Sequence, residues 1–416
     1  MASCKSPYEP REDSTLLEHY VREYAKGDVL DMGTGSGIQA IAAAHSAKVD
    51  SVIATDVMKS AIDYCKKCIK HRKIKKFLIS DLFEGIKRYK SLKGRKFDTI
   101  VFNPPYLPDE LQVRDLTLEG GKKGYEVIER FLNEATYFLK LEGIILLVFS
   151  SLTKKEKVDE FIRNNLLEFE MLEKQHYFFE DIYAYKIEKL EILKELEAYE
   201  IKNLKYFAKG KRGLIFTADY GRQKIAIKIN NPQSQAFMRM ENESRSLGLL
   251  NKHGIGPKLL FHGDGFLAYK FVEGQTIGDF LHNLSKNKQN ERNGSNKNSK
   301  KDKKIIVGLI KKIIAQMYEL DKLKINKQEM SHPHKHIIIG KSNNPVLIDF
   351  ERCKHTISPS NVTQFCDFLA SEHMSGLFME KGISIDKDGL INAARAYKKS
   401  QTNAKFKSII KLIELG

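Results

Sequence analysis

Acidic residues and closely spaced glycines form a pattern that suits a nucleotide-like ligand. The candidate residues are Asp31, Gly33, Gly35, Gly37, Asp56 and Asp81. Glycines between a strand and a helix let the backbone turn tightly and approach a ligand without a Cβ clash. Each acid stands at the end of an apolar run. The ends of parallel strands share one edge of a sheet, so we expect the three carboxylates to meet in one crevice.

Each acid in this pattern has a distinct expected partner on the ligand. Asp31 is placed to receive an ammonium group, and Asp56 lies 19 residues after Gly37, where it can accept from ribose hydroxyls. Asp81 can accept from an adenine amino group while Leu82 packs on the ring. A single acid at such a position more often caps a helix or forms a turn. The combination with the glycine turn favours a ligand site.

A second polar stretch, Asn103-Pro104-Pro105-Tyr106, follows the apolar run 97–102. Two prolines cannot continue a central strand, because neither donates a backbone hydrogen bond and each fixes its own φ. The Asn103 side-chain oxygen and the Pro104 carbonyl can each accept one N–H of a planar NH2 group, and Tyr106 can cover its face. The stretch therefore predicts a clamp that positions a planar nitrogen for reaction.

The second half of the chain contains the parts of an ATP-phosphate site in the expected order. Lys228 stands in the strand-like run "KIAIKIN", and Glu243 follows 15 residues later on a predicted helix as its ion-pair partner. The run "VLIDFE" (346–351) places Asp349 after a strand, where such sites hold Mg²⁺. Each signal alone is weak, but the order and spacing together favour a protein-kinase-like arrangement.

The stretch expected to supply the catalytic base, "NKQEMSHPHKHIIIG" (326–340), departs from the usual H-R-D-x-x-x-x-N pattern. Usual spacings to Asp349 put His336 at the position of the metal-binding Asn and Ser331 at that of the base. A two-residue insertion would instead give the base role to Glu329. His336 would be an unusual Mg²⁺ ligand, since Mg²⁺ prefers oxygen.

The elements that must position these residues alternate between strand-like and helix-like patterns over the first 188 residues. Strands are expected at 28–33, 49–56, 75–83, 97–106 and 143–151, helices between and after them, and a final hairpin at 169–188. This alternation predicts a doubly wound α/β domain with a mostly parallel sheet over residues 1–188.

From residue 189 to 416 the pattern changes to short strands followed by helices, which predicts a two-lobed α+β domain. The stretch 285–304 carries eight Lys or Arg, two acids and no large apolar residue. We expect this basic insert to be disordered.

Composition excludes several classes of protein. The 416 residues are 42% hydrophobic and 30% charged, and no apolar run reaches the length of a membrane span, so we expect no membrane partner. Five cysteines imply no disulfide framework, and the start of the chain is not a secretory signal, so we expect a cytoplasmic protein. The net charge of +17 suits a ribosomal or RNA contact as well as general solubility.

The motifs of the first part resemble those of a known group of enzymes. "DMGTGSG" (31–37) is the usual form of the glycine turn in class I S-adenosylmethionine (SAM) methyltransferases, and with "NPPY" it resembles enzymes that methylate adenine N6 or a glutamine amide. The stretches "YEPREDSTLL" (8–17) and "GGKKGYEVIERFL" (120–132) resemble the archaeal and eukaryotic HemK-like methyltransferases, which modify the glutamine of a Gly-Gly-Gln motif in peptide release factors.

This resemblance implies a Rossmann-like, seven-stranded sheet with SAM as cofactor. It also implies that Ser14 touches the cofactor's carboxylate and that Asn103 with its Pro-Pro-Tyr holds the glutamine. Relatives work with a small zinc-binding activator subunit, which becomes an expected partner. An adenine-N6 methyltransferase on RNA or DNA is the alternative, because N-P-P-Y serves that chemistry too.

The second part resembles the RIO-like kinases and a family of predicted archaeal Ser/Thr protein kinases with an S-x-P-x-K-H-I loop. The resemblance rests on "SHPHKHI" (331–337) and "NVTQFCDFL" (361–369). It implies ATP and Mg²⁺ as ligands, with Lys228 and Glu243 at the phosphates and Asp349 and His336 at the metal. Kinase activity is left open, and a pseudokinase that docks the enzyme on the translation machinery is the alternative.

Overall fold

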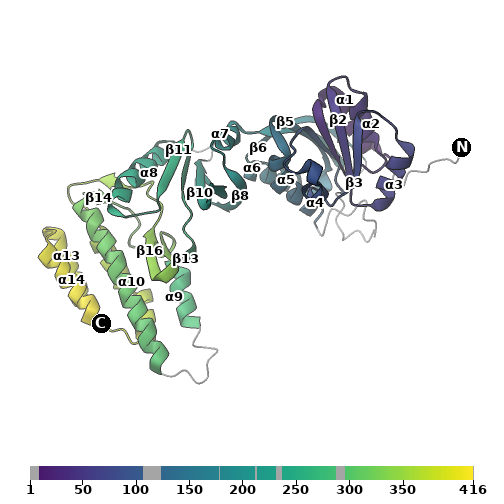
Figure 1. Cartoon of the computed structure of the whole chain (residues 1–416). Coiled ribbons are helices and arrows are strands. Elements are labelled where there is room, and N and C mark those ends of the chain that lie inside the picture. The colour runs from purple at the N-terminus through teal and green to yellow at the C-terminus, as the bar shows by residue number, and fades with distance from the viewer. Residues whose placement is uncertain are drawn as a thin grey trace. The chain divides into compact units, whose positions relative to one another are not determined.

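The computed structural model describes residues 9–105, 123–177, 179–210, 213–230, 237–286 and 296–415. The chain forms two compact units, Met1–Tyr206 and Phe207–Gly416, each with its own core (Figure 1). No described helix combines the length and the apolar character that crossing a lipid bilayer requires.

The first unit is built on a seven-stranded sheet with the order β3-β2-β1-β4-β5-β7-β6. Strands β1 to β5 pair in parallel, whereas β7 runs antiparallel to both β5 and β6. This mixed sheet confirms the predicted Rossmann-like fold and the predicted final hairpin. The strands are β1 Gly27–Met32, β2 Val49–Asp56, β3 Ile74–Ile79, β4 Phe97–Phe102, β5 Leu139–Ser150, β6 Leu167–His176 and β7 Asp181–Lys189.

Helices cover both faces of this sheet, and a separate apolar cluster fills each interface. One cluster joins the strands to α1 and α2, and the other joins them to α4, α5 and α6. The apolar runs at 100–102 in β4 and 144–149 in β5 follow from burial on both faces. The helices are α1 Glu12–Tyr24, α2 Ile38–His45, α3 Lys59–Cys68, α4 Glu84–Arg88, α5 Glu126–Phe138 and α6 Lys155–Asn164.

The parallel register brings the ends of the central strands to one edge of the sheet. Met32 of β1 lies opposite both Thr55 of β2 and Phe102 of β4, and Asp56 lies opposite Ile79 of β3. The turns that follow these strands therefore open on the same rim. This is the edge at which α/β sheets of this kind bind ligands.

The first unit extends beyond the predicted boundary at residue 188. Helix α7 (Glu191–Ala198) buries Leu193 and Leu196. The buried Lys189 donates from Nζ to the Leu139 carbonyl at 2.9 Å and to Glu197 at 2.6 Å. These contacts hold α7 to the first unit, which accounts for the later boundary at Tyr206.

An antiparallel sheet of order β11-β12-β10-β9-β8 underlies the second unit, and the boundary between the units at Tyr206 falls within β8. Helix α8 (Phe237–Leu250) follows β10, and a smaller sheet of order β13-β15-β16 lies further along the chain. The strands are β8 Lys202–Lys209, β9 Gly213–Tyr220, β10 Gln223–Asn230, β11 Leu259–Gly263, β12 Phe266–Lys270, β13 Gly274–Thr276, β14 Ile325–Asn326, β15 Ile337–Gly340, β16 Asn344–Leu347 and β17 Lys354–His355.

The rest of the second unit is helical, and one large apolar cluster joins its helices to α8 and to the strands. The helices are α9 Ile277–Lys286, α10 Asn296–Lys322, α11 Asn361–Leu369, α12 Glu372–Glu380, α13 Lys387–Lys399 and α14 Asn403–Leu415. Helix α10 begins inside the stretch that we expected to be disordered. Lysine is a good helix former, and the basic residues before Ile305 extend this helix toward its N-terminal end. Residues 287–295 of that stretch lie outside the described residues.

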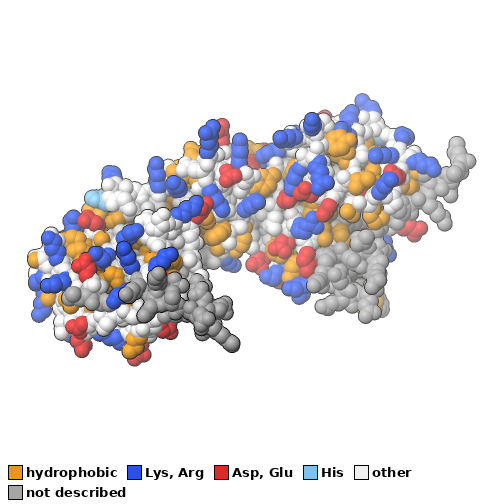
Figure 2. Space-filling model, turned by 60° about the horizontal axis from the view of Figure 1, so that its bottom comes forward, with side chains coloured by type: hydrophobic (Ala, Val, Ile, Leu, Met, Phe, Trp, Pro, Cys, Tyr) orange, Lys and Arg blue, Asp and Glu red, His pale blue; other side chains and the backbone are white. Residues whose placement is uncertain are grey.

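Lysine and arginine side chains are dispersed over the face drawn in Figure 2, with aspartate and glutamate among them. On this face the excess positive charge is therefore spread out. Among the described residues, lysines form ion pairs with acids, such as Lys87 with Glu134 at 2.9 Å and Lys174 with Asp181 at 2.9 Å.

Candidate active sites of the two units

A cavity of about 340 Å³ opens at the rim of the first unit's sheet. Turns after four parallel strands and the start of α1 contribute its walls. Of the residues singled out in the sequence, those that line it are Ser14, Gly33, Gly35, Asp56, Asp81, Leu82, Asn103, Pro104 and Pro105. The structure thus brings the glycine turn, two of the three acids and the Asn-Pro-Pro stretch around one space.

The glycine turn between β1 and α2 depends on left-handed backbone conformations. Gly33, Gly35 and Gly37 have φ values of +67°, +53° and +82°. A Cβ at Gly37 would also lie 2.2 Å from the Ile69 side chain. Glycine is required at this turn because other residues adopt these conformations at a cost and a side chain at residue 37 would clash.

Asp31 lies behind the cavity and is not among the residues that line it. Its side chain is buried and accepts a 2.6 Å hydrogen bond from the Thr34 hydroxyl. Burial raises the pKa of Asp31 to about 7, the Thr34 hydrogen bond opposes this rise, and the nearby Asp56 adds to it. In this structure Asp31 supports the glycine turn, and it does not offer an open carboxylate to an ammonium group.

Asp56 lines the cavity and braces the same turn. One carboxylate oxygen accepts from the Gly35 amide at 2.9 Å and the other from the Met58 amide at 2.8 Å. Burial raises the pKa of Asp56, and these backbone hydrogen bonds oppose the rise. A carboxylate has about four lone-pair positions, so each oxygen retains capacity for a further donor such as a ribose hydroxyl.

Asp81 and Leu82 form the wall after β3. Arg130 of α5 donates to Asp81 at 2.7 Å, and both side chains are about half exposed. Leu82 is buried and has a φ of +45°, which is unusual for a residue with a Cβ. Asp81 therefore reaches the cavity already paired with a cation, which the sequence did not predict.

Asn103 follows β4 and is held by the start of α1. Its Nδ2 donates to Asp13 Oδ2 at 3.1 Å and lies 3.4 Å from the Ser14 hydroxyl. The other Asp13 oxygen accepts from the Ser14 amide at 2.6 Å. These contacts fix the side-chain amide of Asn103 with its nitrogen toward α1 and its oxygen turned away from that helix. Tyr106, the predicted cover of the substrate nitrogen, lies outside the described residues.

Three buried polar atoms at this cavity have no hydrogen-bond partner in the part of the chain that the structure describes. They are Ser36 Oγ, Gln39 Oε1 and Asn103 Oδ1. The other end of Gln39 is anchored, because its Nε2 donates to the Ser14 carbonyl at 2.8 Å. Buried polar groups are almost always paired in native proteins. A polar ligand with an amino-acid end and a nucleoside end, such as SAM, would supply partners for Ser36 Oγ and Gln39 Oε1, and Asn103 Oδ1 is left to accept from a second polar ligand.

The second unit contains a buried ion pair at the place the sequence predicts. Lys228 of β10 lies 2.6 Å from Glu243 of α8, and the other Glu243 oxygen accepts from the Phe350 amide at 3.1 Å. Lys228 also lies 3.3 Å from Asp349 and 3.5 Å from Glu351. Burial opposes the charge of Lys228, but Glu243 and Asp349 raise its pKa above the usual value.

Asp349 follows β16 and has a φ of +63°. Burial opposes its ionisation, but Lys228 and Lys327 lower the pKa of Asp349 below the usual range. The side chain of Lys327, itself buried, donates to the Asp349 carbonyl at 2.5 Å. Lys228 thus contacts the Asp349 carboxylate, and Lys327 holds the backbone carbonyl of the same residue.

The structure distinguishes the two candidate bases by position. Glu329 lies 3.2 Å from His336 and pairs with Arg352 at 2.6 Å, so it belongs to the group around Asp349. Ser331 instead contacts His332 Nδ1 at 3.1 Å. His336 Nδ1 lies 3.7 Å from Asp349 Oδ2, and the metal position stays a prediction.

Several residues at these sites were missed in the sequence. They are Asp13, Ser36, Gln39, Arg130, Lys327 and Glu351. Five of them stand in stretches quoted above, and that neighbourhood was their only signal: Asp13 in 8–17, Ser36 in 31–37, Arg130 in 120–132, Lys327 in 326–340 and Glu351 in 346–351. The places of Gln39 and Arg130 also depend on which helix face turns toward the cavity.

Comparison with known proteins places the first unit in a family. The family model "Methyltransferase small domain" matches residues 12–179. A protein of Methanocaldococcus jannaschii named "Putative protein N5-glutamine methyltransferase" is 34% identical over 160 residues, which are 37% of this chain and 77% of that protein. A release factor glutamine methyltransferase of Aquifex aeolicus is 36% identical over 151 residues, covering 33% of this chain and 53% of that protein.

The chain spans about half the length of this and other bacterial relatives it matches. Among solved structures, it is similar to the E. cuniculi Mtq2-Trm112 complex that methylates the eRF1 termination factor. That match has 27% identity and a TM-score of 0.35 and covers 44% of this chain and 98% of that one. With a relative at 34% identity over 77% of its length and a mixed seven-stranded sheet, the chain belongs through its N-terminal part to the HemK-like family of SAM-dependent protein glutamine methyltransferases.

Proposed function

We propose that the first unit transfers a methyl group from SAM to the side-chain amide of a glutamine in a peptide chain release factor. The family relationship supports the reaction type, and the names of the bacterial relatives support the release factor as substrate. The cavity supports the cofactor, because Ser36 Oγ, Gln39 Oε1 and the carboxylates of Asp56 and Asp81 suit the amino-acid and nucleoside ends of SAM.

The observation that carries this proposal is the orientation of Asn103. Asp13 takes the side-chain nitrogen of Asn103, and Asn103 Oδ1 is left as a buried acceptor without a partner among the described residues. A glutamine amide has two N–H donors in one plane. Asn103 Oδ1 would accept one of them and the Pro104 carbonyl the other, and the stiff Pro104-Pro105 corner would keep both acceptors still.

SAM, when bound, supplies an electrophilic methyl group, so the protein needs to supply position more than acid–base chemistry. Two fixed acceptors set the plane of the substrate amide and direct the nitrogen lone pair out of that plane toward the cofactor side of the cavity. Positioning of this kind can contribute a large part of a rate enhancement. Tyr106 would cover the opposite face of the amide, as the sequence predicts.

The rival reaction is methylation of adenine N6 in RNA or DNA, which needs the same planar NH2 clamp. Purified protein should be incubated with labelled SAM and, separately, a release factor, ribosomal RNA and duplex DNA. We expect label on the release factor and its loss when the Gly-Gly-Gln glutamine is replaced by alanine. Label on nucleic acid with none on the release factor would replace this proposal with its rival.

We also propose that the first unit works with a small zinc-binding activator subunit, by its resemblance to archaeal and eukaryotic enzymes of this kind. The assay above should therefore be run with and without that subunit, and we expect a higher rate with it. A ribosomal or RNA contact remains a prediction from the net charge of +17. Binding that weakens steeply with salt would support it.

A second function is proposed for the second unit, namely binding of ATP with a divalent cation in a kinase-like site. The Lys228–Glu243 ion pair between β10 and α8 favours it. In protein kinases the equivalent lysine contacts the nucleotide phosphates, and a carboxylate after a strand holds the metal. Asp349 stands 3.3 Å from Lys228, and this proximity supports the proposal.

A fluorescent ATP analogue titrated into the full chain tests this second function. We expect saturable binding that requires a divalent cation and that unlabelled ATP displaces. Phosphate transfer to a generic acceptor would distinguish a kinase from a pseudokinase docking module. Absence of nucleotide binding at millimolar concentration, with every divalent cation tried, would contradict the proposed site.

A further inference from the structure

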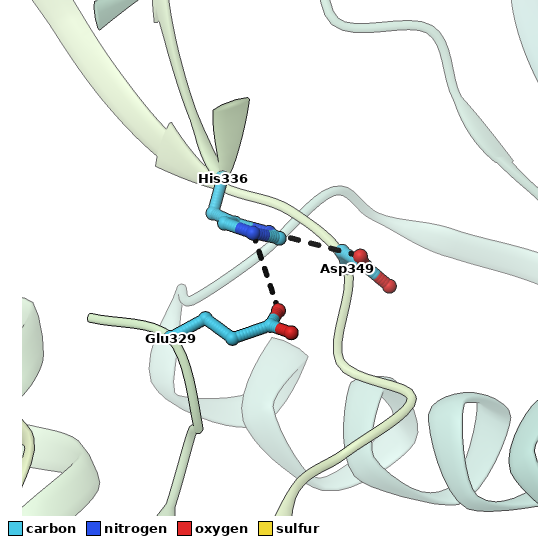
Figure 3. Close-up of side chains that lie close together, drawn as sticks. All are labelled: Glu329, His336 and Asp349. Carbon is cyan, nitrogen blue, oxygen red and sulfur yellow. Dashed lines mark ion pairs between the residues drawn. The ribbon is translucent and has the colours of Figure 1, made fainter. Parts of the chain in front are cut away.

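A histidine lies between two carboxylates in the second unit, and the three residues come from separate segments. His336 precedes β15, Asp349 follows β16, and Glu329 stands in the loop after β14. One ligand atom from each of the three lies within 4.8 Å of the others. Figure 3 shows the imidazole ring of His336 between the carboxylates of Glu329 and Asp349.

The two nitrogens of the His336 ring have different surroundings. Nε2 lies 3.2 Å from Glu329 Oε2, and the other oxygen of Glu329 is held by Arg352 at 2.6 Å. Nδ1 is buried, has no hydrogen-bond partner among the described residues and faces Asp349 Oδ2 at 3.7 Å. This arrangement suits a ring that donates from Nε2 to Glu329 and presents a lone pair at Nδ1.

A histidine that ligates a metal usually donates its other ring N–H to a carboxylate, which fixes the tautomer and the ring orientation. Glu329 and Arg352 provide this support for His336. The Nδ1 lone pair and the Asp349 carboxylate then face each other across a gap that a metal ion can bridge. A metal at this place would be the missing partner of the buried Nδ1.

The neighbouring group of carboxylates already contains a cation. Glu243, Asp349 and Glu351 also converge, and Lys228 contacts all three at 2.6 to 3.5 Å. Lys228 thus offsets part of the charge of that group and engages one oxygen of Asp349. The remaining oxygen of Asp349 faces His336, so it is the one left for the metal.

We propose that His336 Nδ1 and Asp349 Oδ2 bind one divalent first-row transition metal ion in preference to Mg²⁺, with Glu329 as the positioning residue for the imidazole. Mg²⁺ demands oxygen ligands in near-ideal octahedral geometry, whereas imidazole nitrogen suits transition metals. Water and phosphate oxygens would complete the coordination. The inference rests on the proposed nucleotide site of the second unit for those phosphates, while the pair of protein ligands stands on its own geometry.

The test uses Mn²⁺ as the probe, bound to the full chain with a non-hydrolysable ATP analogue. Pulsed electron paramagnetic resonance detects the ¹⁴N nucleus of a directly bound imidazole. We expect this ¹⁴N signal in the wild type and its loss in His336→Asn, which retains an oxygen ligand. His332→Asn, a change at an exposed histidine of the same loop, is the matched control and should keep the signal.

Competition titrations of the same samples measure the choice of metal. We expect the preference for Mn²⁺ over Mg²⁺ to fall about tenfold or more in His336→Asn. Glu329→Ala should weaken Mn²⁺ binding by about tenfold, and Glu329→Gln should restore it because its amide oxygen still accepts from Nε2. An absent ¹⁴N signal in the wild type, or one unchanged in His336→Asn, would overturn the proposal.

The failure of the nucleotide proposal would look different. Mn²⁺ is therefore also titrated alone, without any nucleotide, at millimolar concentration. A ¹⁴N signal that depends on His336 in this sample supports the metal site even if ATP does not bind. Nucleotide binding that is equally supported by Mg²⁺ and Mn²⁺, with no ¹⁴N signal, would retain the ATP site and reject the histidine ligand.

Discussion

Asp13 and Asn103 are 90 residues apart in the chain, and their side chains are joined by a 3.1 Å hydrogen bond at the rim of the first unit's sheet. Asp13 stands in the first turn of α1, and its second oxygen is engaged by the Ser14 amide at 2.6 Å. The carboxylate thus connects the residue expected to touch the cofactor with the residue expected to hold the substrate. The orientation of the Asn103 amide depends on this Asp13 carboxylate.

The hydrogen bond between Asp13 and Asn103 can be tested by substitution. Asp13→Ala should remove the acceptor that fixes Asn103, so the turnover number for methyl transfer should fall about 10- to 100-fold. The Michaelis constant for SAM should change less than the turnover number, because Asn103 is assigned to the substrate. Glu12→Gln, a change of the exposed neighbouring acid, should leave both constants near the wild-type values. Equal turnover numbers for Asp13→Ala and wild type would refute the link.

The buried carboxyl group of Asp31 should make the stability of the first unit depend on pH. The pKa of Asp31 is raised to about 7 in the folded protein, chiefly by burial, and returns to its ordinary value near 3.8 on unfolding. Between these values the folded state holds a proton that the unfolded state has lost, so the free energy of unfolding should fall as pH rises from about 4 to about 7. Above pH 7 this contribution should stay constant.

Asp31→Asn removes this titration but keeps the size of the side chain. Chemical denaturation of both proteins across pH 4 to 8 should show the difference in stability moving in favour of the variant as pH rises. This difference in stability should stop changing near pH 7. A difference that is flat over the whole range would show that Asp31 does not titrate there.

The third prediction separates binding from stability in the second unit. Lys228→Met should abolish nucleotide binding and also destabilise the unit by about 3–5 kcal/mol, because Glu243 is buried and would lose its partner. The double change Lys228→Met with Glu243→Gln should recover most of the stability without recovering binding.

Lys224 provides the control for this prediction, since it lies on the same strand and is exposed. Lys224→Met should bind the fluorescent nucleotide as the wild type does. If the stable double variant still binds the nucleotide with wild-type affinity, then Lys228 does not contact the phosphates and the kinase-like interpretation fails.

The fold of the first unit was predictable because its strands and helices are strongly periodic and its strand ends carry polar residues. Parallel pairing then places those ends at one rim, so Asp56, Asp81 and Asn103 were expected to lie together and do. The sequence did not show in which direction each of these side chains points. Asp31 belongs to the same pattern, but its carboxylate is directed behind the glycine turn to Thr34.

Contacts between distant segments account for most of what was missed. Nothing in the order of residues shows that α1 packs its first turn against the end of β4, so the role of Asp13 was not visible. In the second unit, the usual spacing pointed to Ser331 as the base and a two-residue insertion to Glu329. The contacts of Lys327 and Arg352 hold this loop with Glu329 near Asp349, which favours Glu329.

The proposed role of Asn103, holding a glutamine amide for methylation in a release factor, can be tested most directly on the reaction product. Labelled methyl groups transferred to the release factor should be located by mass spectrometry, with wild-type protein and with Asn103→Ala, alongside SAM binding by calorimetry. We expect one methyl on the Gly-Gly-Gln glutamine with wild type, none with Asn103→Ala, and SAM affinity within about threefold in both. Methyl transfer that survives in Asn103→Ala, or a methyl found on any other residue, would contradict it.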